Sequence, residues 1–556
     1  MKRDLDAMSN RVHDVVIIGG GITGAMVAWD ASLRGLSVAL LEANDFGHAT
    51  TAGSSKLIHG GLRYLKNLEL GLIRESLKER RIWEIIAPHM VFPLEFVMPT
   101  KGFGTKSRWF TRLGLSIYDR LAFDRNWLSD EDKKIPAHRG LSTKALMALQ
   151  PALTSEGIRG GVSYFDCQMV SPERLCLECV IGAAHNGAQT ANYIKAAQFK
   201  YGIQNGMRAV NGVEAIDKFT GARYVIRGRM FVNAAGPWAD LVQESANGGS
   251  AARNLVRSKG VHLITRNLTR NQAVAVQTEN GHLFVLPWRG HSIIGTTDTV
   301  FKGDPEELCV TEDDIEFLLA QTNKAFSGLR LSRRDVLHAY AGLRPLVDTN
   351  PGDGKNSSYN ASRKAEIVDH EDENLACFLS VIGGKWTTSR LIAERTVNLI
   401  GKRLNKSLRP CETHTTPLPG GEVGKFQSFK KRASQKFDFL EPNVCSNLVA
   451  TYGSMAESVA ALAGSSPKLR KSVDVRSSDI AAQVVHAVRE EMAMTVDDII
   501  FRRTGIGTLG HPGGDTVTRI ARIMSSEFGW DAAETVRQVE ATESQFINTL
   551  SPSEVL

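Results

Sequence analysis

A glycine-rich motif near the start of the chain limits the possible folds more than any other feature of the sequence. The apolar run Val15 to Ile18 leads into Gly19-x-Gly21-x-x-Gly24, which opens a predicted helix, and a second apolar run from Ser37 to Leu41 ends at Glu42. Glycines at this spacing allow a tight turn and let a pyrophosphate approach the helix N-terminus, while a carboxylate after the second strand can accept hydrogen bonds from a ribose. Residues 14 to 42 are therefore predicted to form a strand–turn–helix–strand unit that binds a dinucleotide.

Two observations favour FAD over a nicotinamide dinucleotide. The motif lies at the extreme N-terminus, and the apolar run Met230 to Asn233 ends in AAGPW, which resembles the second flavin-binding strand of FAD oxidoreductases. There, Ala235 and Gly236 would let the backbone approach the cofactor closely. A third apolar run, Cys377 to Ile382, ends in GGKWTT. Because these runs are far apart along the chain, the FAD-binding domain is predicted to be discontinuous.

The remaining patterns predict further domains, since a chain of 556 residues is too long for one core. Short strand-like runs at 260–265, 283–287 and 292–296 suit an antiparallel sheet over the active site. The segment 401–424 is rich in Pro, Gly and Thr and is the predicted linker. Amphipathic helices are predicted after it, for example at 497–503.

The predicted fold class is α/β (α+β overall), with a Rossmann-like FAD-binding domain, an antiparallel-sheet substrate cap and a helical C-terminal domain. A helix is also predicted at 68–87. The predicted boundaries are 1–90, 155–255 and 341–400 for the discontinuous FAD-binding domain, 91–154 and 256–340 for the cap, 401–424 for the linker, and 425–556 for the C-terminal domain.

Composition and the N-terminus exclude several classes of protein. Hydrophobic residues make up 42% of the chain and charged residues 23%, as in ordinary globular proteins. No run approaches the roughly 20 apolar residues that a membrane-spanning helix needs, so any membrane contact is expected to be peripheral. The first fourteen residues have no apolar secretory segment and contain three Asp, which argues against a mitochondrial presequence. We therefore expect the cytoplasmic side of a bacterial cell.

Charge and cysteine content add little that is specific. The net charge of +7 is compatible with an anionic substrate or lipid, and no dense basic tract or recognised motif predicts nucleic-acid binding. Seven cysteines, an odd number, do not resemble a disulfide framework. Cys176 and Cys179 form a C-x-x-C pair without further ligands nearby, so we interpret them as two cysteines on one face of a helix and expect no metal.

The stretch SSKLIHGGLRYL, Ser54 to Leu65, closely resembles the signature of FAD-dependent glycerol-3-phosphate dehydrogenases, within the wider amine and hydroxyacid oxidase superfamily. The resemblance extends over nearly the whole chain, including its C-terminal part. It implies oxidation of sn-glycerol 3-phosphate to dihydroxyacetone phosphate in glycerol catabolism, by hydride transfer to FAD, which is expected to be noncovalent because no Cys or His stands in a recognised attachment motif. The other similar segments, in the family's order, are YFDCQ from Tyr164, VNAAGPWAD from Val232, IIGTTDT from Ile293, AGLRPL from Ala341, GGKWTT from Gly383 and MTVDDIIFRRTG from Met494.

The resemblance also implies the site residues. The implied catalytic residues are His59, Arg63, Tyr64 and Lys385. Arg344 and Arg363 are implied to bind the substrate phosphate, which suits the guanidinium group because it can form two hydrogen bonds to phosphate oxygens. The implied cofactor-binding residues are Gly19, Gly21, Gly24, Glu42, Ser54, Ser55, Gly60, Gly61, Ala235, Gly236, Gly384 and Thr387.

Two of these residues have alternative interpretations. His59 is the favoured proton acceptor because imidazole titrates near neutral pH, but a His beside two glycines could instead hydrogen-bond the cofactor or the backbone. Arg363 is followed by Lys364 and Ala365, where the family usually has an acid and an aromatic residue. The residues that would support Arg363 therefore differ from the family pattern.

Membrane quinone is the leading prediction for the electron acceptor. An oxygen-using glycerophosphate oxidase typically carries an extra insertion that we do not recognise here, and an anaerobic subunit-type enzyme would carry a cysteine-rich C-terminal module, whereas no cysteine follows Cys445. A catalytically inactive flavoprotein that serves as a sensor or assembly subunit is a further alternative, and the presence of the site residues argues against it. A homodimer is left open.

The segment Lys101 to Phe123 is a candidate contact with an anionic lipid surface. Its basic residues and its aromatic and aliphatic residues alternate in a pattern that suits an interfacial segment, and an amphipathic core helix explains the pattern equally well. The expected location is therefore peripheral, on the inner face of a bacterial cell membrane. The alternating residues are Lys106, Arg108 and Arg112 with Trp109, Phe110, Leu113, Leu115 and Tyr118.

Overall fold

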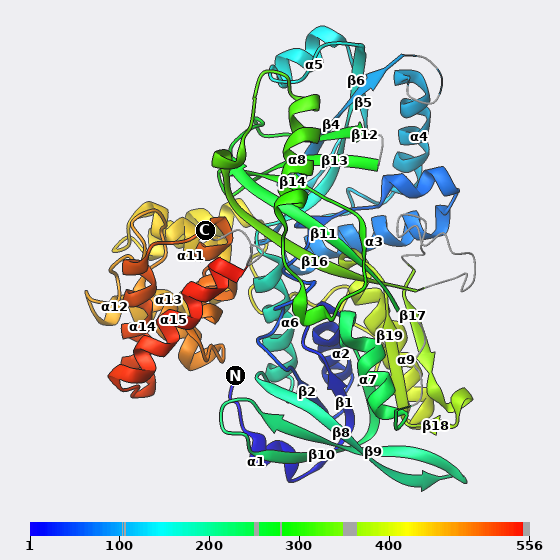
Figure 1. Cartoon of the computed structure of the whole chain (residues 1–556), viewed down its shortest axis with the longest axis vertical. Helices are drawn as coiled ribbons and strands as arrows, with labels where there is room; N and C mark the ends of the chain where they lie inside the picture. Colours follow the sequence, from blue (N-terminus) through cyan, green and yellow to red (C-terminus); the bar gives the residue numbers. More distant parts are fainter. Residues whose placement is uncertain (103, 105–106, 250–254, 279–280, 348–363, 549–556) are drawn as a thin grey trace.

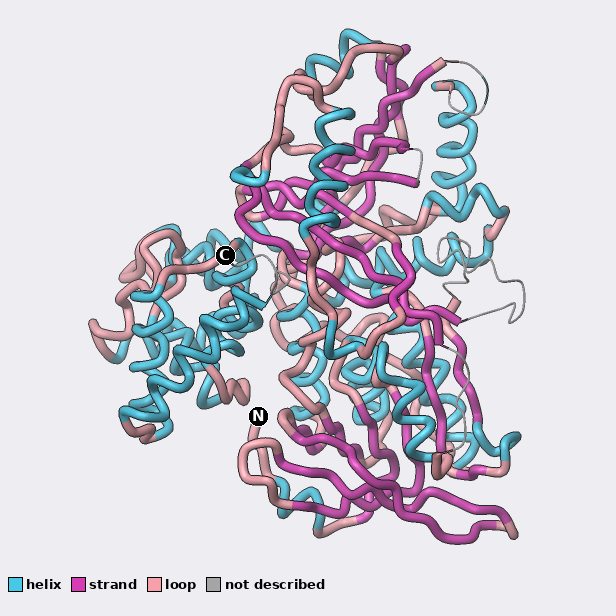
Figure 2. The backbone as a smooth tube through the Cα atoms, in the orientation of Figure 1, coloured by secondary structure: helices cyan, strands magenta, loops and turns pink. Residues whose placement is uncertain are grey.

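The computed structural model of the chain describes residues 1–556 apart from 103, 105–106, 250–254, 279–280, 348–363 and 549–556, and apart from the side chains of Arg63, Lys66, Ile547 and Asn548. Its strands form two large sheets, and a group of helices at the C-terminal end packs to one side of them (Figure 1, Figure 2). The predicted fold class is confirmed.

The first sheet has a parallel centre in the order β19–β10–β1–β2–β7. Parallel strands end at the same edge of a sheet, so this edge gathers the residues that follow each of them. The central strands are β1 (Val12–Ile18), β2 (Val38–Leu41), β7 (Gln189–Ala191), β10 (Arg223–Asn233) and β19 (Phe378–Ile382). The flanking strands are β8 (Ile194–Gln204), β9 (Met207–Asp217), β17 (Glu366–Asp369) and β18 (Leu375–Ala376).

Both faces of this sheet are buried at β1, which explains why its apolar run is uninterrupted. Val15 and Ile17 pack with α2 (Ile22–Leu33), α6 (Pro172–His185) and α9 (Ser389–Arg403), whereas Val16 and Ile18 pack into a second cluster on the other face. The second cluster includes residues of α1 (Leu5–Ser9), β8 and α7 (Ala239–Ala246). The predicted strand, turn, helix and strand over residues 14–42 are confirmed.

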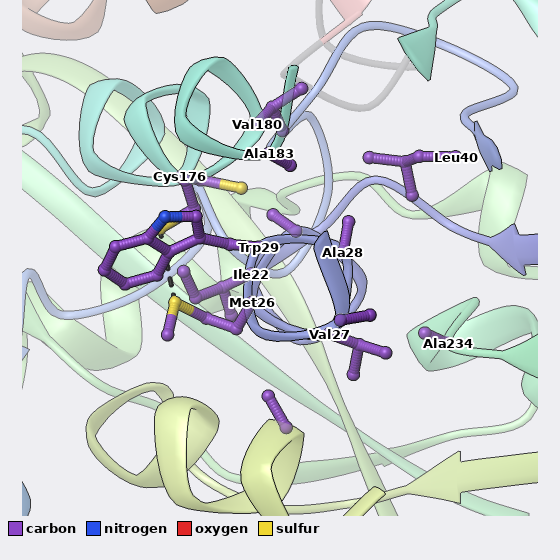
Figure 3. Close-up of a cluster of buried hydrophobic side chains, with 14 of the residues drawn as sticks. Ile22, Met26, Val27, Ala28, Trp29, Leu40, Cys176, Val180, Ala183 and Ala234 are labelled. Atoms are coloured by element: carbon purple, nitrogen blue, oxygen red, sulfur yellow. Dashed lines mark hydrogen bonds between the residues drawn. The ribbon is translucent and has the colours of Figure 1, made fainter. Parts of the chain in front are cut away.

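The C-x-x-C pair belongs to the core on the helical face. Cys176 and Cys179 are buried free thiols of α6; Cys179 Sγ lies 3.3 Å from Met26 Sδ of α2, and Cys176 belongs to the same buried cluster as Trp29 (Figure 3). Burial raises the pKa of both thiols well above its ordinary value. The interpretation as two helical cysteines is confirmed.

The second sheet is mainly antiparallel and runs in the order β15–β11–β14–β13–β12–β4–β6–β3, with β16 paired to β11 and β5 to β6. The predicted runs at 260–265, 283–287 and 292–296 fall in β11, β13 and β14. The strands are β3 (Leu57–Ile58), β4 (Val91–Lys101), β5 (Arg139–Leu141), β6 (Ile158–Met169), β11 (Leu255–Arg266), β12 (Ala273–Thr278), β13 (Gly281–Trp288), β14 (His291–Gly295), β15 (Thr299–Phe301) and β16 (Val336–Val347).

Helices α3 (Leu70–Ile86), α4 (Arg108–Leu121), α5 (Thr143–Leu149) and α8 (Glu312–Ala325) accompany the second sheet. After α9 the chain runs without a regular element to Lys425, in agreement with the predicted linker. Within the described ranges, no helix is both long enough and apolar enough to cross a membrane. The C-terminal helices are α10 (Phe426–Lys436), α11 (Pro442–Tyr452), α12 (Ala456–Ser465), α13 (Ala481–Glu490), the π-helix η10 (Asp498–Arg503), α14 (Gly514–Phe528) and α15 (Ala532–Asn548).

The predicted domain boundaries stay a prediction, and sheet membership differs from them at the short strand β3, which lies within 1–90 but belongs to the second sheet, and at two long strands. β6 falls within the segment 155–255 assigned to the FAD-binding domain, yet it pairs with β4 in the second sheet. β16 crosses the boundary at 340 and pairs with β11. The positions of β6 and β16 are set by their pairing with β4 and β11, which are distant in the sequence, and local periodicity does not encode such pairing.

Candidate active site

The edge at which the parallel strands end opens into a cavity of about 760 Å³ that extends to the second sheet. Cofactor and small-molecule sites commonly enclose about 300–1,000 Å³. Most of the predicted site residues line this cavity, although they come from distant parts of the chain. They are Gly19, Gly21, Glu42, Ser54, Ser55, His59, Tyr64, Ala235, Gly236, Arg344, Gly384, Lys385 and Thr387.

Glu42 joins the glycine-rich turn to the end of β2. Its Oε2 accepts a hydrogen bond from the backbone N–H of Gly20 at 2.6 Å, and its Oε1 accepts one from the N–H of Asn44 at 2.8 Å. Burial raises the pKa of this carboxyl, and the two backbone donors oppose the shift. The carboxylate is thus fixed at the cavity wall, in the position that the dinucleotide motif predicts for a ribose contact.

The motif glycines are required by close backbone contacts. Gly19 has φ +108°, and a Cβ there would lie 2.5 Å from the carbonyl oxygen of Ala234 after β10. A Cβ on Gly24 would lie 1.9 Å from the carbonyl oxygen of Gly19. Gly21 is the N-cap of α2 and has no side chain to cap it, while Thr51 Oγ1 accepts the N–H of Ile22 at 3.0 Å. Gly21, Ile22 and Thr23 line the cavity at this helix end, and the turn fits the pyrophosphate of FAD.

Gly60 and Gly61 allow close packing around the turn that carries His59, and neither is among the described residues that line the cavity. A Cβ on Gly60 would lie 2.3 Å from the hydroxyl of Tyr118. Gly61 has φ +77°, and a Cβ there would lie 2.4 Å from the ring of Tyr64. Gly24 likewise contributes packing and does not contact the cavity.

His59 lies in the turn between β3 and the short 3-10 helix η1 (Leu62–Asn67). Its backbone N–H donates to Thr387 Oγ1 at 3.1 Å, and its ring Nδ1 accepts a hydrogen bond from the Gly61 N–H at 3.1 Å. A neutral imidazole that accepts at Nδ1 carries its hydrogen on Nε2. The backbone thus sets both the orientation and the tautomer of this ring.

Lys385 reaches the same part of the cavity from the loop after β19. Its Nζ donates to Ser76 Oγ of α3 at 2.9 Å, and the ammonium lies over the ring of Tyr64. Tyr64 itself is buried and packs in a cluster with Leu77 of α3 and with residues of the second sheet. A fixed positive charge therefore stands beside His59 and Tyr64.

Arg344 of β16 is held by polar groups of the neighbouring strand and loop. Its Nη1 donates to Ser258 Oγ at 3.0 Å, its Nη2 donates to Thr296 Oγ1 at 2.8 Å, and both nitrogens lie 3.3 Å from the carbonyl oxygen of Thr297. On β11, a Cβ at Gly260 would lie 2.1 Å from Nη2, so a glycine is needed for this arrangement. The guanidinium group is consequently positioned before any substrate binds.

His262 of β11 also lines the cavity, and the sequence analysis missed it. Its Nε2 lies 2.8 Å from Ser55 Oγ, and its ring stacks on Tyr340 with centroids 4.9 Å apart. Burial, reinforced by the positive charges of Arg344 and Lys56, holds the pKa of His262 well below its ordinary value. His262 lies in a continuously buried stretch of β11, and a single His in such a strand carries no local signal of function.

A buried ion pair supports the turn that carries His59. Asp166 of β6 accepts hydrogen bonds from Arg80 Nη1 at 2.7 Å, from the Tyr118 hydroxyl at 2.9 Å and from the Gly60 N–H at 3.2 Å. Asp166 belongs to the YFDCQ segment, for which the sequence provided no role. The three contacts tie α3, α4 and the His59 turn to one carboxylate.

Two predicted site residues cannot be placed in this arrangement. The side chain of Arg63 and the whole of Arg363 lie outside the described residues, although the backbone of Arg63 is part of η1. Across the described part of the chain, no group of three or more His, Cys, Asp or Glu side chains is arranged to hold a metal ion.

Comparison with known proteins identifies the family to which the chain belongs. Residues 14–399 match the family model described as FAD dependent oxidoreductase, and residues 411–535 match the C-terminal domain of alpha-glycerophosphate oxidase. A glycerol-3-phosphate dehydrogenase of Synechocystis sp. is 33% identical over 552 residues, which is 97% of this chain and 97% of the relative. An aerobic glycerol-3-phosphate dehydrogenase of Staphylococcus aureus is 35% identical over 90% of this chain and 87% of its own length.

A solved structure is similar over the same extent. The glycerol-3-phosphate dehydrogenase of Bacillus halodurans, complexed with FAD, has a TM-score of 0.77 and 29% sequence identity, and the match covers 98% of this chain and 96% of that chain. A glycerophosphate oxidase of Mycoplasma pneumoniae, at 19% identity and a TM-score of 0.54, shares the fold over 74% of this chain. The chain is an FAD-dependent enzyme that belongs to the glycerol-3-phosphate dehydrogenase and oxidase family.

Proposed function

We propose that the protein oxidises sn-glycerol 3-phosphate to dihydroxyacetone phosphate and passes the electrons to a membrane quinone. The observation that carries the proposal is the meeting of His59, Tyr64, Lys385 and Arg344 at one cavity that also contains the dinucleotide motif. Two cationic side chains that line the same cavity, Arg344 and Lys385, suit a dianionic phosphate ester, and the relatives support the same substrate.

In this proposal Arg344 binds the substrate phosphate, and Arg363 is its expected second partner. Arg344 is suited to the role because Ser258 and Thr296 fix its guanidinium group in advance, so that binding a phosphate costs little additional ordering. Lys385 places a positive charge near the reacting end, where negative charge develops as the hydroxyl loses its proton. When bound, FAD accepts the hydride from the substrate carbon.

His59 is our proposal for the group that exchanges a proton with the substrate hydroxyl. The Gly61 N–H donates to its Nδ1, and the residue lines the cavity beside the predicted cofactor turn. For Nε2 of the neutral His59 ring to accept the proton of the substrate hydroxyl, the hydrogen on Nε2 must first move to Nδ1. The hydrogen bond from the Gly61 N–H to Nδ1 would then break. His262 is the second candidate, because its depressed pKa keeps the imidazole neutral and its Nε2 contacts Ser55 at the cavity.

The choice of quinone is supported by the outer surface of α4. Trp109, Phe110 and Leu113 project from this helix into solvent, with Trp109 70% exposed and Leu113 61% exposed, whereas Leu115 and Tyr118 face the core. An exposed apolar stripe of this kind marks a contact surface rather than an ordinary solvated face. Of the five apolar residues in the predicted interfacial pattern, these three are exposed, whereas Leu115 and Tyr118 are not.

Basic residues border this apolar stripe. The guanidinium of Arg112 lies 5.5 Å from the Trp109 ring, and that of Arg74 lies 4.4 Å from the ring of Phe123, which is also exposed. Aromatic rings at the lipid interface with Arg beside them suit an anionic bilayer surface. We therefore propose peripheral binding to the inner face of the cell membrane through α4, on the side of the molecule away from the C-terminal helices (Figure 1).

The test separates the substrate from the acceptor. Under anaerobic conditions, glycerol 3-phosphate should bleach the flavin of the purified enzyme, whereas glycerol should bleach it slowly. The reduced enzyme is then mixed either with quinone-loaded anionic vesicles or with oxygenated buffer. Faster reoxidation by the vesicles supports the quinone proposal. Faster reoxidation by oxygen would identify an oxidase, and failure to bleach would favour a sensor or assembly subunit.

A further inference from the structure

Two consecutive arginines of the C-terminal domain form salt bridges with one carboxylate of the FAD-binding domain. Arg502 Nε donates to Asp45 Oδ2 at 2.5 Å, and Arg503 donates to the same oxygen through Nη1 at 2.6 Å and to Oδ1 through Nη2 at 3.1 Å. Both arginines belong to the π-helix η10 within the MTVDDIIFRRTG segment, which has no role in the proposed reaction. Asp45 is fully buried.

Asp45 lies within loop 42–51, which is hydrogen-bonded to the glycine-rich turn at both of its ends. Glu42 begins this loop and accepts the Gly20 N–H, as described above. At its other end Gly47 N–H donates to the Gly20 carbonyl oxygen at 3.0 Å, and Thr51 Oγ1 accepts the N–H of Ile22, the first residue of α2, at 3.0 Å. Loop 42–51 therefore forms one side of the ribose and pyrophosphate site.

The contact is an integrated ionic network rather than a single pair. Asp498 Oδ1 accepts from Arg502 Nη2 at 2.5 Å and from the Tyr193 hydroxyl at 2.6 Å, which orients Arg502. Arg503 Nη2 also donates to the carbonyl oxygen of Glu491 at 2.9 Å. The two guanidinium groups hold the pKa of Asp45 well below its ordinary value, so the carboxylate stays charged. A buried carboxylate that lost these partners would have to move toward water.

We propose that Arg502 and Arg503 are positioning residues for the cofactor: by anchoring Asp45 they hold loop 42–51 against the glycine-rich turn, so that the C-terminal domain contributes to FAD affinity. The inference rests on the proposed placement of the ribose at Glu42. FAD binding and docking of the C-terminal domain both involve loop 42–51, so each stabilises the other. Loss of the arginine contacts must therefore weaken FAD binding.

The experiment measures FAD retention by the purified full-length holoenzyme. Enzyme is diluted to graded concentrations, separated by ultrafiltration, and free and bound flavin are quantified to obtain a dissociation constant. The variants are Arg503→Gln, Arg503→Lys and Asp45→Asn. The matched control is Arg289→Gln, because Arg289 donates from the second sheet to the Gly505 carbonyl oxygen of the C-terminal domain at 2.8 Å without touching loop 42–51.

Arg503→Gln and Asp45→Asn should raise the dissociation constant of FAD by about tenfold or more, since truncating one partner of a buried charge pair is costly. Arg503→Lys keeps the charge and should restore part of the affinity. Excess FAD should restore turnover in Arg503→Gln, which a defect in chemistry would not permit. Wild-type FAD affinity in Arg503→Gln, or an equal loss in Arg289→Gln, overturns the proposal.

If Arg503→Gln does not fold, Arg503→Lys decides the question by hydrogen exchange of the holoenzyme. The amides of Gly20 and Gly47 should exchange faster in that variant than in Arg289→Gln, and equal protection of these amides contradicts the proposed role. Neither the FAD dissociation constant nor the exchange rate requires a substrate or an electron acceptor, unlike the supplementary turnover measurement. The outcome is therefore independent of whether glycerol 3-phosphate and quinone are correctly assigned.

Discussion

The ammonium of Lys385 lies 3.9 Å from the centre of the Tyr64 ring. A cation against an aromatic face keeps its charge while losing part of its hydration, so its field in the cavity is strong and fixed in direction. The two residues are far apart in the sequence. They meet because the turn after β3 and the loop after β19 both pack against α3.

Lys385→Met should slow reduction of the bound flavin by glycerol 3-phosphate by about 100-fold, because it removes a fixed charge aimed at the reacting oxygen and leaves an unbranched side chain only one atom shorter. Stopped-flow bleaching under anaerobic conditions measures this rate. The control is Lys78→Met, an exposed lysine on the same helix as Ser76. A wild-type bleaching rate in Lys385→Met would contradict the assignment.

Arg344→Ala should reduce kcat/KM for glycerol 3-phosphate by an amount equivalent to about 2–5 kcal/mol, because a buried charged hydrogen bond to phosphate is lost. Activity toward glycerol, which lacks the phosphate, should change much less. Arg333→Ala is the control, since Arg333 is exposed and pairs with Glu312 at 2.9 Å away from the cavity. An equal loss with both substrates would mean that Arg344 does not bind the phosphate.

Replacing Trp109, Phe110 and Leu113 with Ser should release the protein from anionic vesicles, because the three side chains bury apolar area in the interface when α4 docks. Flotation with lipid vesicles measures binding, and anaerobic bleaching checks that the flavin site is intact. The control substitutes Ile203 and Val475, which are exposed apolar residues of β8 and of the C-terminal domain. Undiminished flotation of the α4 variant would exclude this helix as the anchor.

His338 predicts a specific acid sensitivity. Burial lowers its pKa from 6.5 to about 4, so between these values the unfolded chain binds more protons than the folded one. Stability should therefore fall as pH decreases through this window, by at most about 1.4 kcal/mol per pH unit from this group. His338→Gln should show a smaller drop in Tm between pH 6.5 and pH 4.5 than the wild type, while the exposed His185→Gln should not. Identical pH dependence in both variants would refute the role of His338.

The parallel centre of the fold and its dinucleotide turn could be predicted from sequence because the signal is local. An apolar run, three glycines and an acid at fixed spacing each have a steric or electrostatic reason, and Gly19, Gly24 and Glu42 occupy the positions that those reasons require. The resemblance to a known family then placed His59, Tyr64 and Lys385 together. Their common cavity depends on pairing between distant strands, which periodicity alone does not reveal.

Other parts of the site could not be predicted for physical reasons. His262 and Asp166 lie in strands whose pattern records burial and not chemistry, and their partners Ser55 and Arg80 belong to other elements. The segment around α4 was ambiguous because a helix at a lipid interface and an amphipathic helix packed on a core have the same spacing of apolar residues. Only the tertiary structure distinguishes the exposed Trp109 from the buried Tyr118.

The pairing of Asp45 with Arg502 also has a consequence for biosynthesis. The two residues are 457 positions apart, so at about 5–20 residues per second roughly 20–90 s of translation separate them on the ribosome. The glycine-rich turn emerges first, yet β10, β19 and finally η10 must follow before its loop is anchored. A nascent chain therefore carries an open nucleotide turn for most of its synthesis, and secure capture of the flavin becomes a post-translational event.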